Sequence, residues 1–369
     1  SGFSTLSNPG KKKILEITKH SPRKLISLTL EDGRKIELTE SHKVYLKGKE
    51  QKRAGDLEIG DKLMASYIRD IEEKEIKELF LPEIFKERED IMLSNIKNYL
   101  EKFENIKKYK NYYLRDNFPI ILVKTILEKN NKALSDLPKE TKISIKRDII
   151  KLPIRVKLDS GLLETIGLYL AEGFARKNES KKSFFQVSIA GNTEIKSLIK
   201  KTFLSHFEIT PSEEHEDHIT FSSKILYELF VIYLKTGNRA SNKRIPSLFL
   251  NLKKEKIAAL LRGYFEGDGS VSLSDIRVAC DTISEGLKHD LSFLLSRFGI
   301  FTKFYEYEKE PGPKVREFYI KKNREIPKFK ITKITIPSDF VKKFKQIGFI
   351  SQRKNSILEG LCKKKPYGM

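Results

Sequence analysis

Two stretches of the chain combine apolar residues at helical spacing with the same ending. Residues 165–173 read TIGLYLAEG and residues 261–269 read LRGYFEGDG, so each closes on an acid followed by a glycine. Apolar residues with this period predict a helix that buries one face. The two acids, Glu172 and Asp268, stand 96 residues apart at equivalent positions of the two predicted helices.

Small residues four positions apart predict how these helices meet. Gly167 and Ala171 share one side of the first helix, and Gly263 and Gly267 share one side of the second. Small side chains at this spacing let two helix backbones approach closely. We therefore expect the two helices to pack together and to bring their terminal acids side by side.

An acid at the end of a helix is electrostatically unfavourable. The C-terminal end carries partial negative charge, which costs a nearby carboxylate about 0.3–1 kcal/mol. Two acids that converge there also repel each other. A divalent cation removes both problems, because hard cations such as Mg²⁺ prefer carboxylate oxygens. The alternative for each motif alone is a solvated acid before a glycine that ends the helix.

The pattern that follows each motif helix predicts an internal repeat. Short alternating runs predict strands, and longer runs have the period of a helix. In the first copy we expect strands at 184–189 and 218–222, and helices at 193–207 and 224–235. In the second copy we expect strands at 271–273, 276–280, 302–307 and 328–336, and helices at 284–298 and 339–346. The recurrence of this order predicts two related units.

Residues 67–152, which precede the first motif, are highly charged. Helical spacing at 71–79 and 92–103 predicts a helix-rich region. Residues 107–113 read KKYKNYY, where cations alternate with aromatic side chains. The region is either a connecting helical layer or an accessory module that contacts DNA.

The net charge and the cysteine content limit the possible partners and sites. The formal net charge is +22, from 72 Lys+Arg against 50 Asp+Glu. Such an excess favours a polyanionic partner, with nucleic acid before a membrane surface. The two cysteines, Cys280 and Cys362, argue against a disulfide framework or structural zinc and fit a reducing, cytoplasmic setting in an archaeal or bacterial cell. No apolar run has the length of a transmembrane helix, and the abundance of Lys, Glu and Ile hints at a thermophilic source.

The two acid–glycine motifs resemble those of single-chain LAGLIDADG homing endonucleases, over residues 150–360. The resemblance implies an α+β fold in which two pseudo-symmetric αββαββα repeats form a β-sheet saddle. It implies that Glu172 and Asp268 bind catalytic Mg²⁺, with Mn²⁺ as a possible substitute. The backbone carbonyls of Ala171 and Gly267 would complete the metal sites. It also implies a monomer that binds double-stranded DNA sequence-specifically.

Lysines beside such a site can hold a water molecule or neutralise developing charge. Lys243, in the stretch NKRIP, matches the family's catalytic lysine ahead of the second motif. Lys354, in QRKN, occupies the corresponding place after the second repeat. In a chain this rich in lysine, the alternative for either residue is a solvated charge.

The predicted strands carry polar residues that suit phosphates and base edges in the major groove. In 328–336, alternation places Lys328, Lys330 and Thr332 on one face and Phe329, Ile331 and Lys333 on the other. An ordinary hydrated sheet face is the alternative for any single residue. The predicted DNA-binding set is Gln186, Ser188, Arg277, Asp281, Lys303, Lys328, Lys330, Thr332 and Lys333.

A second resemblance covers residues 13–66. The alternating runs 25–30 and 35–39 around an EDGR turn predict a β-hairpin. The TESH sequence that follows and a later GD turn resemble the interior of an intein splicing (Hint) domain. In that family, Thr39 and His42 would polarise the peptide bond at the upstream splice junction. The chain carries neither the nucleophile that would stand well upstream nor a terminal His-Asn, so we expect that it does not splice as it stands.

These patterns divide the chain into three regions. A partial Hint-type β domain is expected at 1–66 and a helical linker or accessory region at 67–152. The endonuclease domain is expected at 153–369, with one repeat at about 158–250 and the other at about 251–360. The predicted function is site-specific cleavage of both strands of a long, asymmetric DNA target. The alternatives are a non-cleaving DNA- or RNA-binding descendant such as a maturase, and an intein whose splicing residues lie outside this chain.

Overall fold

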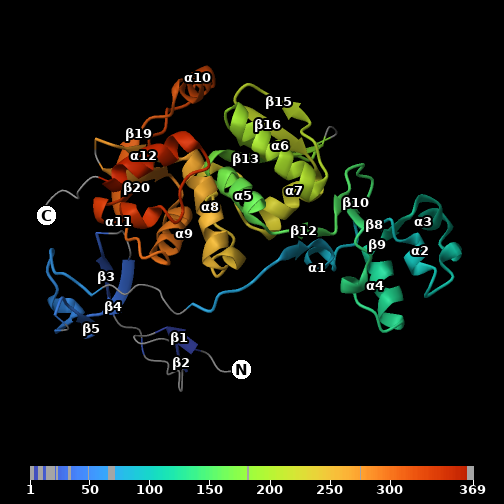
Figure 1. Cartoon of the computed structure of the whole chain (residues 1–369), viewed down its shortest axis with the longest axis horizontal. Coiled ribbons are helices and arrows are strands. Elements are labelled where there is room, and N and C mark those ends of the chain that lie inside the picture. Colours follow the sequence, from blue (N-terminus) through green and yellow to red (C-terminus); the bar gives the residue numbers. More distant parts are fainter. Residues whose placement is uncertain are drawn as a thin grey trace.

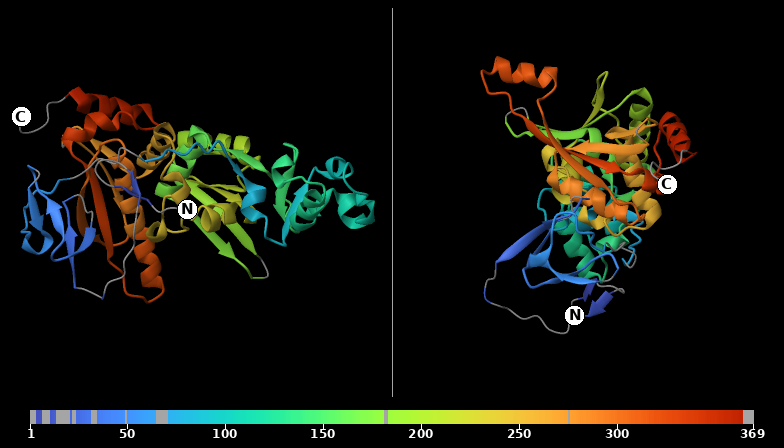
Figure 2. Two further views of the ribbon diagram at one scale, coloured as in Figure 1. Left: turned by 90° about the horizontal axis from the view of Figure 1, so that it is seen from below. Right: turned by 90° about the vertical axis from the view of Figure 1, so that its left-hand side faces the viewer.

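The structure is a computed structural model that describes residues 4–6, 11–13, 21, 24–31, 35–48, 50–64, 71–180, 183–274 and 276–363. The fold is α+β, with helices packed on several small antiparallel sheets (Figure 1). Two units of matching topology form its centre. Figure 2 shows residues 24–64 and the region around 81–153 at opposite ends of these units.

The first unit contains one motif helix and a four-stranded antiparallel sheet of order β13-β14-β16-β15. Its elements are α5 (Ser160–Glu172), β13 (Gly173–Asn178), β14 (Phe184–Ala190), α6 (Thr193–Phe207), β15 (Glu213–Glu214), β16 (His218–Ser222) and α7 (Lys224–Glu228). A π-helical segment, Leu229–Tyr233, continues α7. Asp159 caps α5, because its side chain accepts the backbone N–H of Leu162.

The second unit repeats this order with a sheet of order β17-β18-β20-β19. Its elements are α8 (Lys254–Gly267), β17 (Gly269–Ser272), β18 (Arg277–Thr282), α9 (Glu285–Ser296), β19 (Lys303–Lys309), α10 (Pro313–Lys321), β20 (Phe329–Ile336), α11 (Ser338–Phe344) and α12 (Gln352–Lys363). The prediction of two αββαββα repeats is confirmed. The second repeat has an extra helix, α10, between its last two strands.

The two repeats meet where α5 crosses α8. A Cβ atom on Gly263 would lie 1.9 Å from the carbonyl oxygen of Glu164, and one on Gly167 would lie 2.2 Å from that of Leu260. Neither position can hold a side chain, so the backbones touch directly, as the spacing of small residues predicted. The Arg262 guanidinium also reaches across to the Glu164 carboxylate at 2.6 Å.

The region that precedes the repeats differs from the prediction, because it mixes short helices with a sheet of order β11-β10-β8-β9. Its elements are β7 (Glu78–Phe80), α1 (Leu81–Phe85), β8 (Ile91–Ser94), α2 (Lys97–Leu100), α3 (Lys110–Arg115), β9 (Asn117–Pro119), α4 (Ile120–Lys129), β10 (Lys142–Ile145), β11 (Leu152–Pro153) and β12 (Arg155–Lys157). The helix predicted at 92–103 is wrong for its first part, where β8 is buried on both faces. A fully buried apolar strand cannot be told from a helix by periodicity.

The helix predicted at 71–79 is also wrong. This segment runs extended along the second repeat and ends in β7, which pairs with β12. Glu73 forms an ion pair with the buried Arg297 at 2.8 Å, and the Lys74 backbone bridges to Leu252. Tertiary contacts therefore decide its conformation over helix propensity.

The N-terminal region forms short antiparallel hairpins. Their strands are β1 (Ser4–Leu6), β2 (Lys11–Lys13), β3 (Leu25–Thr29), β4 (Lys35–Thr39), β5 (Lys43–Tyr45) and β6 (Gln51–Arg53). The pairing of β3 with β4 confirms the predicted hairpin, although most of its EDGR turn lies outside the described residues. Thr39 and His42 stand next to each other at the end of β4, since the His42 N–H donates to the Thr39 carbonyl at 3.0 Å. Across the described residues, no helix is long and apolar enough to span a membrane.

Candidate active site

The structure brings the two motif acids to one place. Glu172 is the last residue of α5 and Asp268 directly follows α8, so each acid lies where a motif helix passes into the first strand of its sheet. A Cβ atom on Gly267 would lie 2.9 Å from Cγ of Glu172 and 2.6 Å from Cβ of Ala171. The helix ends are therefore in contact, and the negative charge of Glu172 raises the pKa of Asp268.

The two acids differ in their surroundings. Glu172 is exposed, whereas Asp268 is half-buried. Desolvation by the surrounding protein, followed by the charge of Glu172, raises the pKa of Asp268 to about 8. A hydrogen bond from the Tyr264 hydroxyl and the charge of Lys243 act in the opposite direction. These two effects are smaller than the desolvation and the charge of Glu172, so the Asp268 carboxyl is largely protonated at neutral pH.

This donor set fits a hard divalent cation. Both acids offer carboxylate oxygens, and an added positive charge would relieve their repulsion. Nowhere in the described part of the chain do three or more His, Cys, Asp or Glu side chains gather in a geometry that could hold a metal ion. Glu172 and Asp268 would thus need further ligands, for which the nearby backbone of Ala171 and Gly267 offers carbonyl oxygens.

Lys243 is held against the last turn of α5. Its Nζ donates to the carbonyl of Tyr169 at 2.8 Å and lies 3.2 Å from the centre of the Tyr169 ring. Only 1% of Lys243 is exposed. Burial lowers the pKa of its ammonium group well below the ordinary value, and the charge of Asp268 opposes this shift.

Lys354, which belongs to α12, contacts the end of α8 in the equivalent way. Its Nζ donates to the carbonyls of Glu266 at 2.5 Å and Gly269 at 2.8 Å, with a longer contact of 3.4 Å to Phe265. Phe265 stands three residues before Asp268, as Tyr169 stands three residues before Glu172. Each lysine thus places its Nζ against the backbone carbonyls at the negative end of a motif helix, an arrangement that sequence reasoning missed.

The predicted DNA-binding residues of the second repeat separate onto two faces. Directly paired residues of an antiparallel sheet share a face. Asp281 pairs with Lys333, and Lys303 pairs with Thr335, a residue that also pairs with Ala279. By alternation, Arg277 lies on this same face. Four predicted residues therefore share one face, which we call the open face of this sheet.

The grouping of Lys328, Lys330 and Thr332 as a reading face is wrong for Thr332. Thr332 is 4% exposed and shares its side of β20 with the buried Ile334 and Ile336. Nζ of Lys330 forms an ion pair with the Glu306 carboxylate at 2.7 Å, and Lys328 is exposed just before β20. Alternation identifies two faces but does not say which one the helices cover.

In the first repeat, Gln186 and Ser188 lie opposite the buried Val187 and Ile189. Ser188 is fully buried, and its hydroxyl bonds that of Thr220 at 2.7 Å. The Gln186 side chain accepts from Nε of Arg176 at 2.7 Å. Sequence reasoning missed Arg176, because the strand that carries it, β13, has no alternating pattern.

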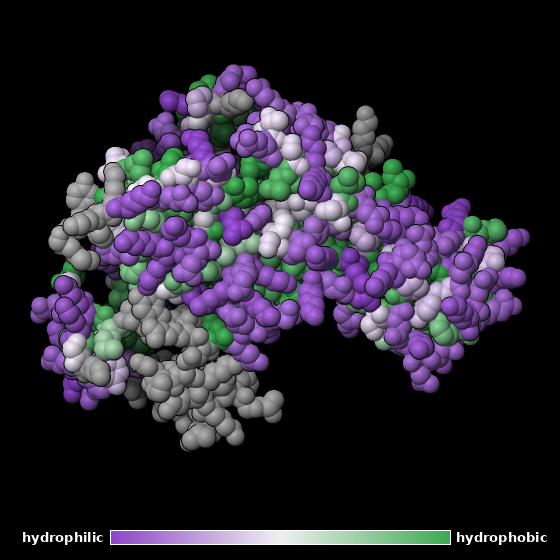
Figure 3. All heavy atoms as spheres, viewed as in Figure 1, coloured by the Kyte–Doolittle hydropathy of each residue, from purple (hydrophilic) through white to green (hydrophobic). Residues whose placement is uncertain are grey.

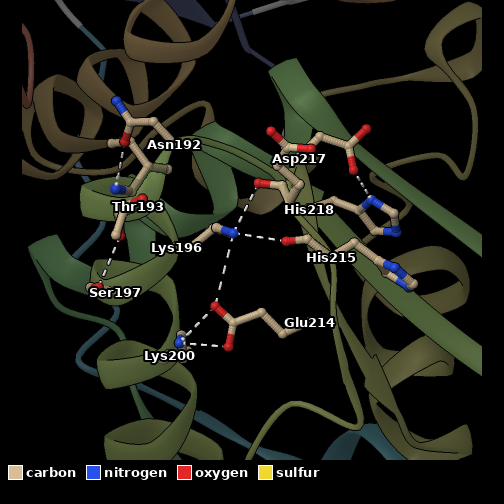
Figure 4. Close-up of polar contacts among 11 residues, drawn as sticks. Asn192, Thr193, Lys196, Ser197, Lys200, Glu214, His215, Asp217 and His218 are labelled. Carbon is tan, nitrogen blue, oxygen red and sulfur yellow. Dashed lines mark hydrogen bonds and ion pairs between the residues drawn. The ribbon is translucent and has the colours of Figure 1, made fainter.

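A buried lysine holds the β15–β16 hairpin at the edge of this sheet (Figure 4). Nζ of Lys196 donates to the carbonyls of His215 at 2.7 Å and Glu216 at 2.9 Å. Lys200 fixes the neighbouring Glu214 at 2.8 Å. The hairpin and its imidazoles, including His218, are therefore anchored to α6, and sequence reasoning did not single them out.

Comparison with known proteins gives a family match within the second repeat. Residues 255–347 match the model of a LAGLIDADG-like domain. The chain is 32% identical over 357 residues to the DNA polymerase II large subunit of Thermococcus kodakarensis, covering 93% of this chain and 20% of that protein. It therefore spans about a fifth of the length of that relative.

Two other relatives have different names. The RNA polymerase subunit Rpo1C of Methanocaldococcus jannaschii is 28% identical over 60% of this chain and 23% of its own length. A probable translation initiation factor IF-2 of Thermococcus kodakarensis is 34% identical over 25% of this chain and 8% of its own length. A solved structure of an I-DmoI variant with its target DNA and Mn shares 15% identity at a TM-score of 0.35, covering 53% of this chain and 96% of that one.

Proposed function

We propose that this chain, whose residues 255–347 match the model of a LAGLIDADG-like domain, is a site-specific endonuclease that cuts both strands of double-stranded DNA with a divalent metal. The observation that carries the proposal is the convergence of Glu172 and Asp268 at the contact between the two motif helices. Hydrolysis of a phosphodiester requires stabilisation of negative charge on the phosphate, and two adjacent carboxylates suit a cation that provides it.

In this proposal, Glu172 and Asp268 hold the metal, and the carbonyls of Ala171 and Gly267 complete its shell. A divalent cation, Mg²⁺ or Mn²⁺, supplies Lewis-acid stabilisation of the charge on the phosphate. Lys243 and Lys354 place their amines at the two helix ends, where a positive charge would oppose the repulsion between the phosphate and the acids.

The surface supports a DNA partner. The net charge is +22, and Figure 3 shows hydrophilic side chains over most of the visible face. The open face of the second sheet offers Arg277, Asp281, Lys303 and Lys333 to phosphates and base edges. Because the first sheet instead exposes Arg176, which the buried Gln186 holds, we expect a long and asymmetric recognition site.

The relatives support the interpretation that a sequence of this kind is inserted into different host proteins. A DNA polymerase, an RNA polymerase subunit and a probable initiation factor have unrelated tasks, yet each shares part of its sequence with this chain. The shared part is a small fraction of each protein. Together with the Hint-like order around Thr39 and His42, this favours a homing endonuclease of the intein-encoded type.

The proposal is tested by cleavage of a randomised or genomic duplex library in Mg²⁺, Ca²⁺ or EDTA. We expect one long site to be cut on both strands with Mg²⁺ only. Glu172→Gln and Asp268→Asn should each lower the cleavage rate by about 10³-fold, because each removes a ligand of the charge-stabilising cation. DNA binding, measured by gel shift in Ca²⁺, should persist.

A matched control is Glu194→Gln, which neutralises an exposed acid in the first turn of α6. This variant should cut as the wild type does. A wild-type protein that binds one site but never cuts it with any divalent metal would contradict the catalytic proposal and favour the binding-only alternative.

A further inference from the structure

The segment that carries Lys243 is held by the opposite repeat. Nε and Nη2 of Arg244 donate to the two carboxylate oxygens of Asp290 at 2.7 and 2.8 Å. The same carboxylate accepts the backbone N–H of Ile245 at 3.0 Å. Asp290 lies in the middle of α9 and is 5% exposed. A buried carboxylate with three such bonds fixes the backbone next to Lys243.

The start of α9 contacts the same segment. The Ser284 hydroxyl donates to the carbonyl of Lys243 at 2.7 Å and accepts the N–H of Leu287 at 3.2 Å as the helix cap. A Cβ atom on Gly286 would lie 2.1 Å from Cδ of Arg244, so the segment packs directly on this turn. α9 and its cap thus contact the Lys243 carbonyl and the two residues that follow Lys243.

Lys354 is anchored differently. Oε2 of Glu266 accepts the backbone N–H groups of Ile350 and Ser351, each at 2.9 Å, just before the helix that carries Lys354. Glu266 belongs to α8, the helix whose end Lys354 contacts. Lys354 is therefore anchored within its own repeat. Lys243 contacts the first repeat, and its segment bonds that repeat through the Arg244 N–H and the Thr236 carbonyl at 3.2 Å, but the Arg244 side chain and the Ile245 N–H are held by the second repeat.

We propose that Asp290 is a positioning residue that sets Lys243 on the end of α5, so that the second repeat controls the lysine of the first. The proposal rests on the proposed endonuclease function for its consequence, but its geometry is independent of that function. Without the Asp290 carboxylate, Arg244 and the N–H of Ile245 lose their shared acceptor. A displacement of about 1 Å at a catalytic group can cost about 100-fold in rate.

The first test measures the position of Lys243 without DNA. Lysine amines are acetylated under limiting reagent, and each site is quantified by mass spectrometry. Lys243 should react at least about tenfold faster in Asp290→Asn and faster still in Asp290→Ala, because local opening exposes its amine. The acetylation rate of Lys354 should be the same as in the wild type. Glu266→Gln should give the reverse pattern, with Lys354 affected and Lys243 protected.

Glu73→Gln is the matched control for general loosening of α9. It breaks an ion pair to Arg297, at the other end of this helix, and makes no contact with the Lys243 segment in the bonds that the structure describes. Both lysines should keep wild-type reactivity in this variant. An Asp290→Asn protein in which Lys243 stays protected, or in which both lysines become reactive together, overturns the proposal.

The second test follows each DNA strand separately. Asp290→Asn should slow the Lys243-dependent strand about 10–100-fold at saturating DNA, with nicked duplex accumulating and affinity unchanged. Combined with Lys243→Met, Asp290→Asn should cause no further loss of cleavage rate. Combined with Lys354→Met, the losses of cleavage rate from the two substitutions should add fully. Full additivity with Lys243→Met also overturns the proposal. A wild type that never cuts would refute the proposed function instead, and the acetylation result would stand.

Discussion

The two halves of the candidate active site share their geometry but not their environment. On the first-repeat side, the acid Glu172 is exposed and its lysine, Lys243, is fully buried. On the second-repeat side, Asp268 is half-buried with a pKa near 8, and Lys354 is only partly buried. One backbone crossing therefore carries two unlike pairs of an acid and a lysine.

The side chain one turn before each acid also differs, although its effect opposes the raised pKa of Asp268. Tyr264 stands one turn before Asp268 and shares a hydrogen bond with it, while the equivalent position before Glu172 is Leu168. The fold fixes where the acids lie, since the glycines at the crossing leave no freedom. The neighbouring side chains then give each acid its own surroundings, so two repeats of one fold need not perform equal chemistry.

The largest effect should come from breaking the crossing on which both halves depend. Gly263→Ala places a methyl group 1.9 Å from the Glu164 carbonyl, a contact that backbone atoms cannot relieve by rotating. We expect a loss of about 3 kcal/mol or more in the free energy of unfolding, despite the better helix propensity of alanine. Urea denaturation followed by circular dichroism measures this loss.

Gly312→Ala is the control, because a Cβ atom there meets nothing within 4 Å. It should unfold at the wild-type urea concentration. Equal stability of Gly263→Ala and the wild type would mean that the two helices do not touch as described, and the comparison of the two acids would lose its basis.

The next effect separates the two acids. Asp268 binds more protons in the folded than in the unfolded chain between about pH 4 and pH 8, so wild-type stability should fall as the pH rises through this window. Asp268→Asn should abolish this fall and be more stable than the wild type by about 2–5 kcal/mol at pH 8. Thermal unfolding without metal across this pH range measures the difference.

Glu172→Gln sharpens the same experiment. It leaves the desolvation of Asp268 in place but removes the second-largest cause of its raised pKa, so the fall in stability should shrink without vanishing. Mg²⁺ should raise the melting temperature of the wild type and of neither variant. Identical pH profiles for all three proteins would contradict the unequal environments.

Local patterns predicted the elements that build this site. The acid–glycine endings and the small residues at 167, 171, 263 and 267 depend only on helical spacing, and both the helices and their contact are confirmed. The strands of 184–189 and 328–336 were recognised because they alternate. Such features need no knowledge of distant parts of the chain.

The remaining features depend on contacts that no local pattern records. β13 forms because its backbone pairs with β14 over six residues, not because GFARKN alternates. The extended course of 71–79 depends on partners such as Arg297, more than 200 residues away. Likewise, nothing in the sequence links Asp290 to Arg244, and the covered face of β20 is set by the helices packed on it.

The smallest effect concerns α10, the element that the second repeat has and the first lacks. The first repeat joins β15 to β16 through residues 215–217, whereas α10 lies between β19 and β20 and stands clear of the body in Figure 1. Exposed basic residues on α10 and just after it are Arg316, Lys321 and Lys322. We expect α10 to extend the DNA contact on the second half-site only.

The triple substitution Arg316→Gln, Lys321→Gln, Lys322→Gln should weaken DNA binding about tenfold and lower the slope of log Kd against log salt by up to about 3, one per lost phosphate contact. Footprinting should lose protection on one flank, with cleavage at saturating DNA unchanged. The same change at Lys107, Lys108 and Lys110 tests the accessory region for comparison. If that change shortens the footprint and the α10 change does not, the extra reach belongs to the accessory region, and the repeats are alike in how far they contact DNA.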